Sequence, residues 1–137
     1  MQELRDFLNH VIIAKRRLKE IYYTTRDSNV KADAKQLVVA TITVQKSLEH
    51  LITLHRKSKI GKKVLEDRKA SLTLRKWSIG LPKRVKNFVD KKKKMSPEHL
   101  RKFQENLLAY LEEIGVELTA WAEDIQTLSE IPRPPKE

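Results

Sequence analysis

The stretch "SPEHLRKFQENLLAYLEEIGVELTAWAEDIQTL" (96–128) carries the strongest helical pattern of the chain. It opens with three residues that favour a helix start: Ser96 as the N-terminal cap, Pro97 at the first helical position, and Glu98 beside the positive end of the dipole. We therefore expect a long last helix with an acidic outer face, in an all-α protein. Its apolar side chains recur almost as heptads, as in helical bundles: Leu100, Phe103, Leu107, Leu111, Ile114, Leu118, Trp121, Ile125 and Leu128.

The first third of the chain predicts two more helices. Residues 3–25 show one apolar stripe at helical spacing, and "RDSN" (26–29) predicts a turn with a new N-cap. The segment "QLVVATITV" (36–44) resembles a buried strand, but its stripe continues as a helix to about residue 58 and no partner strand exists. The stripes are Leu4, Phe7, Leu8, Val11, Ala14, Leu18, Ile21 and Tyr22, then Leu37, Val44, Leu48 and Leu51.

The region before residue 96 is the least regular. Gly61 fits either the end of the second helix or the interior of a longer one. A third helix is expected over about 62–78, with Val64, Leu65, Leu72 and Leu74 as apolar contacts. "GLP" (80–82) should break it, although Pro82 also suits the first turn of a short continuation through "KRVKNFV" (83–89).

These helices predict an up-and-down antiparallel four-helix bundle, with a short extra helix or loop before the last helix. The 137 residues fit one domain, which we place at 1–130, and "IPRPPKE" (131–137) should form a proline-rich disordered tail. The N-terminus lacks the apolar core of a signal peptide, and we expect no membrane-spanning segment. The chain has no cysteine, which suits a reducing compartment, so we expect a soluble cytoplasmic protein.

The net charge of +11 is concentrated in the middle of the chain. Basic residues exceed acidic ones by 14 in residues 56–102, whereas acidic residues are in excess by 6 in residues 103–137. This asymmetry points to a polyanionic partner, with RNA or DNA ahead of an anionic membrane surface. A merely solvated basic face is the simpler alternative.

The candidate nucleic-acid-binding residues all lie in this basic segment. Lysine dominates and no aromatic series is interleaved, so we expect contacts to the phosphate backbone without base recognition. Trp77 could stack on a base, but the more usual role of such a residue is core packing. The candidates are Arg56, Lys57, Lys59, Lys62, Lys63, Arg68, Lys69, Arg75, Lys76, Lys83, Arg84, Lys86, Lys91, Lys92, Lys93 and Lys94.

Catalytic chemistry has no support in the sequence. The histidines at 10, 50, 55 and 99 form no metal-binding pair, and the three glycines build no phosphate-binding loop. The paired acids of the last helix fit a solvated face. We therefore expect neither enzyme activity nor a metal or cofactor.

Three motifs resemble a known family. "LRKW" (74–77), "MSPEHL" (95–100) and "YLEEIGVELTAW" (110–121) follow one another as they do in the accessory variability determinant (Avd) proteins of diversity-generating retroelements. The resemblance covers about residues 35–125. It implies a four-helix bundle that assembles into a positively charged five-membered ring.

The same resemblance implies partners and a function. The ring would bind a reverse transcriptase and its template RNA and support mutagenic cDNA synthesis without being catalytic. Arg75 and Trp77 would take part in a way that the motif does not specify. Two departures from the family are a longer stretch from Ile79 to Lys94 and about one more turn before Gly115.

Two alternatives stay open at this point. One is a helical subunit of another ribonucleoprotein complex, such as the small subunits of CRISPR effector complexes, and the other is a pure protein-interaction bundle. The bare run Lys91–Lys94 lies in the longer stretch. We expect it to form a mobile cationic lip that contacts the RNA backbone.

Overall fold

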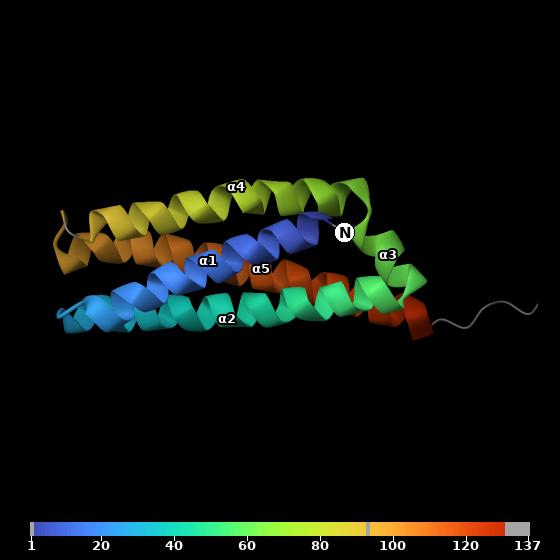
Figure 1. Ribbon diagram of the computed structural model, residues 1–137, viewed down its shortest axis with the longest axis horizontal. Coiled ribbons are helices and arrows are strands. Elements are labelled where there is room, and N and C mark those ends of the chain that lie inside the picture. The colour runs from blue at the N-terminus through green and yellow to red at the C-terminus, as the bar shows by residue number, and fades with distance from the viewer. Residues whose placement is uncertain (1, 93, 131–137) are drawn as a thin grey trace, which may run out of the picture.

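The structure is a computed structural model that describes residues 2–92 and 94–130, and the predicted tail lies outside them. Successive long helices run in opposite directions (Figure 1). The fold is therefore all-α, a four-helix bundle with one additional short helix, as the sequence predicts. The helices are α1 (Gln2–Thr24), α2 (Ser28–Lys57), α3 (Lys59–Leu65), α4 (Arg68–Lys91) and α5 (Pro97–Glu130).

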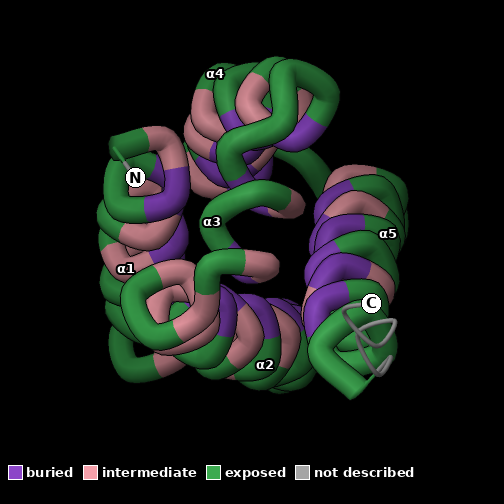
Figure 2. Tube along the Cα trace, turned by 90° about the vertical axis from the view of Figure 1, so that its right-hand side faces the viewer, coloured by how far each residue is buried: buried purple, intermediate pink, exposed green. Residues whose placement is uncertain are grey.

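Viewed end-on (Figure 2), the long helices lie at the corners of a square, and the connection from α2 to α4 crosses its diagonal. The antiparallel hairpins α1/α2 and α4/α5 lie against each other, with α1 beside α4 and α2 beside α5. No backbone contacts join α1 to α5 or α2 to α4 among the described residues. The short α3 makes the diagonal connection from α2 to α4, and it lies between the helix ends when the bundle is viewed end-on (Figure 2).

The core is built from the apolar stripes of the four long helices. In α1 the buried positions are Leu4, Phe7, Val11, Ala14, Leu18 and Ile21, all members of the predicted stripe. Trp77 is only 7% exposed and its ring lies 5.5 Å from those of Phe7 and Trp121. Core packing is therefore confirmed for Trp77. Leu72 and Leu128, expected to be core contacts, are exposed instead.

A polar layer fixes the register between the parallel helices α2 and α5. The buried carboxylate of Asp33 accepts a hydrogen bond of 3.1 Å from Arg101, and Gln104 Nε2 donates to Gln36 Oε1 at 2.8 Å. A buried polar group costs little only when it is paired. Sliding α2 by one turn along α5 would break both pairs, so they favour this register over its neighbours.

The helix starts follow from capping residues. The side chain of Asp27 accepts hydrogen bonds from the backbone N–H groups of Asn29 and Val30, which confirms the turn predicted before α2. At the last helix, the backbone N–H of Leu100 donates to the carbonyl oxygen of Ser96 at 3.0 Å, while the Ser96 hydroxyl lies 2.7 Å from His99 Nδ1, so the predicted side-chain cap is replaced by a side-chain pair. The helix begins at Pro97, as the start signal predicts.

The third long helix differs from its prediction at both ends. Asp67 caps α4, which begins at Arg68 and continues through Pro82 to Lys91, so the expected break at "GLP" is wrong. The stripe of Leu81, Val85 and Phe88 is buried on both sides of the proline. Packing of that stripe outweighs the hydrogen bond that Pro82 removes. The extra short helix consequently lies between α2 and α4, and not directly before the last helix.

Candidate nucleic-acid interface

The candidate cations nearest to α3 gather at one end of the bundle. Arg56 and Lys57 form the last turn of α2, the α3 lysines follow, and Arg68 and Lys69 open α4. All of these side chains are exposed. Because α3 crosses the end of the square, it places these charges beside the helix ends, on the right in Figure 1. This group, which we call the α3-end cations, consists of Arg56, Lys57, Lys59, Lys62, Lys63, Arg68 and Lys69.

Three helices surround a small cavity within this end. The cavity has a volume of about 260 Å³ and is lined by Arg5 of α1, Arg56 of α2 and Lys62 of α3, together with Leu4, Ile52 and His55. Three of the six lining residues are thus basic and none is acidic. Arginine and lysine in such a concave site favour a phosphate group.

Arg5 is absent from the candidates drawn from the sequence. It stands in a mixed segment, "MQELRDF", some fifty residues before the basic centre, so local charge gives no signal for it. The antiparallel α1/α2 hairpin brings the start of α1 beside the end of α2, where α3 begins. Pairing the two predicted helices as a hairpin would have been enough to find it.

Close packing and polar contacts hold α3 in position. Ser58 accepts a hydrogen bond from the backbone N–H of Gly61, and His55 Nε2 lies 2.9 Å from Glu66 Oε1. Gly61 is a buried part of α3, where a Cβ would lie 2.4 Å from the carbonyl oxygen of Leu54. The glycine therefore belongs to the short helix and allows α3 to approach the last turn of α2.

Two candidate arginines on α4 have intramolecular partners. Arg75 Nη2 lies 3.3 Å from Glu3 Oε1, and the guanidinium of Arg84 lies 3.9 Å from the ring centroid of Tyr110. Their neighbours Lys76, Lys83 and Lys86 are exposed. The mid-helix lysines are thus more available to a partner than the two arginines.

The partners of these arginines titrate away from their ordinary ranges. A hydrogen bond with its own backbone, followed by those from Ser71 and Arg75, lowers the pKa of Glu3. Burial raises the pKa of Tyr110, against the opposing effect of the Arg84 charge. Glu3 therefore loses its proton more readily, and Tyr110 less readily, than the same side chain free in water.

The lysine run lies at the opposite end of the bundle. Lys91 belongs to the last turn of α4 and Lys92 caps it, so the expected loop begins later than predicted. Lys94 is exposed, and Lys93 lies outside the described residues. An α-helix rises about 1.5 Å per residue, so α4 separates the run from the α3-end cations by roughly 36 Å. The structure therefore does not bring the two basic groups together.

Comparisons with known proteins identify no relative. No protein-family model, no curated protein and no solved structure matches the chain. The described residues contain no group of three or more His, Asp or Glu side chains placed to hold a metal ion.

One helix meets the usual length and hydropathy criteria for a membrane span, contrary to the expectation from the sequence. It is α2, Ser28–Lys57, which qualifies by length and composition only. The core helix of a soluble protein passes the same test. In this bundle, α2 buries one stripe against its neighbours, and its outer side is unusually apolar around Val39.

Proposed function

We propose that this chain is a non-catalytic accessory protein that binds the RNA backbone through the α3-end cations. The observation that carries the proposal is the convergence of Arg5, Arg56 and Lys62 from three helices on one cavity. Each phosphate neutralised by such a cation releases condensed counterions, which favours binding. The exposed face of α5 is acidic, so it would repel the RNA backbone and favour contact with the basic surface of α3 and the adjoining turns of α2 and α4.

Backbone contact is favoured over base recognition. Both tryptophans are buried, and the most exposed aromatic residue of the described part, Tyr23, lies at the end of the bundle that carries the lysine run, away from the α3-end cations (Figure 1). Proteins that stack bases need an exposed aromatic platform. Binding should therefore depend strongly on salt and weakly on sequence.

We further propose that the RNA is the template of a diversity-generating retroelement and that the protein partner is its reverse transcriptase. The support is the resemblance to Avd proteins at residues 74–77, 95–100 and 110–121. Leu74, Trp77 and Trp121 of these motifs pack in the core, so the motifs support the kind of bundle more than the partner. Co-elution of the chain with such a reverse transcriptase and template RNA tests this part of the proposal.

Removing the three cations around the cavity should weaken RNA binding. For the variant Arg5→Gln, Arg56→Gln, Lys62→Gln we expect the slope of log K against log salt to fall by about 2, and affinity by about 50-fold at physiological salt. The measurement is fluorescence anisotropy with an unstructured, labelled RNA over a range of KCl concentrations. The matched control is Arg16→Gln, Lys19→Gln, Lys46→Gln, which removes three exposed charges from α1 and α2. Equal losses in the two variants would show that net charge alone drives binding.

The lysine run should act as a second, independent contact. Replacing Lys91, Lys92, Lys93 and Lys94 with serine should lower the salt slope by up to about 3 if all four meet phosphates. Because roughly 36 Å separates the run from the α3-end cations, only an RNA long enough to span the bundle should sense the change. An unchanged slope with such an RNA would exclude the lip. A short RNA serves as the internal control.

A further inference from the structure

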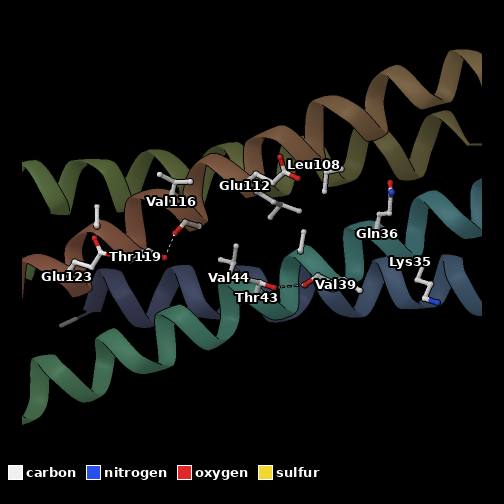
Figure 3. Close-up of a pocket in the computed structure, with 14 residues that line it drawn as sticks. Lys35, Gln36, Val39, Thr43, Val44, Leu108, Glu112, Val116, Thr119 and Glu123 are labelled. Atoms are coloured by element: carbon white, nitrogen blue, oxygen red, sulfur yellow. Dashed lines mark hydrogen bonds between the residues drawn. The ribbon is translucent and has the colours of Figure 1, made fainter. Parts of the chain in front are cut away.

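A large apolar groove runs between α2 and α5. Its volume is about 900 Å³, and apolar or small side chains from both helices form most of its walls (Figure 3). Val39 of α2 is 55% exposed and Val116 of α5 is 71% exposed. An exposed apolar patch of this kind is more often an interaction site than an ordinary part of a protein surface.

Gly115 gives the groove a second unusual property. It lies in the middle of the 34-residue α5, where glycine costs about 1 kcal/mol relative to alanine. A Cβ at this position would meet nothing within 4 Å, so no close approach inside the chain accounts for the glycine. It lines the groove, where a missing side chain would let another helix come close.

The outer surface of α4 carries a ridge that complements this groove. Leu72 is 53% exposed and Ile79 is 74% exposed, and an ideal helix places them about 10.5 Å apart on one face. Lys76 and Lys83 lie on the same face by their spacing of three and four residues from these apolar side chains. We call these four residues the α4 ridge.

The two surfaces carry net charges of opposite sign. Glu112 and Glu123 line the groove together with one cation, Lys35, and the exposed side of α5 is acidic, whereas the α4 ridge is basic. Two α4 ridges would repel each other, and so would two acidic α5 faces. Complementary charges favour ridge against groove and disfavour both symmetric pairings.

We infer that the α4 ridge of one copy of this chain docks in the α2/α5 groove of another. Leu72 and Ile79 enter the apolar floor, Lys76 and Lys83 meet the glutamates of the groove, and the helix backbone passes close to Gly115. The contact joins different surfaces of the two copies, so it generates a closed ring or an open chain. It rests on the proposed function in one respect: Lys76 and Lys83 serve assembly, and the α3-end cations serve RNA.

Disulfide trapping tests this contact directly, because the chain has no cysteine of its own. Ile79→Cys and Val116→Cys, one of them tagged, are purified separately, mixed and oxidised. We expect a covalent heterodimer that forms at least tenfold faster in the mixture than a homodimer forms from either variant alone. The control replaces Ile79→Cys with Tyr23→Cys, which is as exposed but lies outside the ridge. Trapping of Val116 to Val116, or equal rates with the control, would overturn the inference.

A charge swap separates assembly from RNA binding. The solution mass of wild type, measured by light scattering, should exceed one chain, and Lys76→Glu, Lys83→Glu should reduce it to one chain. Mixing that variant with Glu112→Lys, Glu123→Lys should restore association between the two variants. Retained RNA binding by a monomeric groove variant would keep the proposed function intact. A wild-type chain that stays monomeric at high concentration would overturn the inference, even if it binds RNA.

Discussion

Trp77→Ala should lower the free energy of unfolding by about 3–5 kcal/mol, the usual cost of deleting a large buried aromatic side chain. The indole lies between Phe7 of α1 and Trp121 of α5, with ring centroids 5.5 Å away on each side. Removing it therefore opens a cavity where three helices meet. Urea denaturation followed by circular dichroism measures the loss.

The control Trp77→Phe separates packing from ligand binding. Phenylalanine keeps most of the aromatic contact with Trp121, so its cost should be well below that of alanine. Its RNA affinity should equal that of wild type, because the ring is buried. A large loss of RNA affinity in a stable Trp77→Phe protein would restore the base-stacking role that the structure disfavours.

Gly61→Ala should destabilise the protein by about 1–3 kcal/mol, as overpacking does elsewhere. The added Cβ would lie 2.4 Å from the carbonyl oxygen of Leu54 and 2.8 Å from its carbonyl carbon, and this backbone cannot move without shifting α2 or α3. Movement of α3 would also displace Lys62 from the cavity. We therefore expect a loss of RNA affinity together with the loss of stability, measured on the same preparation.

Gly115→Ala is the matched control for this substitution. Within one chain its Cβ would enter open space, so in the monomeric background Lys76→Glu, Lys83→Glu helix propensity alone should stabilise the protein by up to about 1 kcal/mol. The two identical replacements should thus change stability in opposite directions. Equal destabilisation by both would mean that α3 is not held against α2 as closely as the structure places it.

The sequence predicts the individual helices better than their arrangement. Ser96 and Pro97 mark the start of α5 because capping depends on neighbouring residues only, and the stripes of α1 and α2 have the same local origin. The continuous α4 was missed because the proline rule is local, whereas Leu81 and Phe88 are buried by other helices. Packing between distant segments outweighed a local preference.

The candidate site likewise combines features that the sequence shows with features that depend on the arrangement of the helices. The basic centre is visible in the sequence, since the α3-end cations are close together along the chain. The pairing of Arg75 with Glu3, and the approach of Arg5 to Lys62, require the order of helices around the square. That order has no signature in the spacing of apolar residues, because each stripe faces the same core whichever helix lies beside it.

The diagonal course of α3 also bears on how the molecule reaches its native state. Each hairpin joins segments that are close along the chain, so both can form rapidly and independently. Docking the two preformed halves then admits two arrangements of opposite handedness, which bury similar stripes. Because Gly61, Ser58 and Glu66 hold the short helix against the end of α2, we expect it to favour the arrangement that leaves α2 and α4 on a diagonal. We therefore expect the seven residues of α3 to determine how the two hairpins dock, in addition to carrying basic side chains.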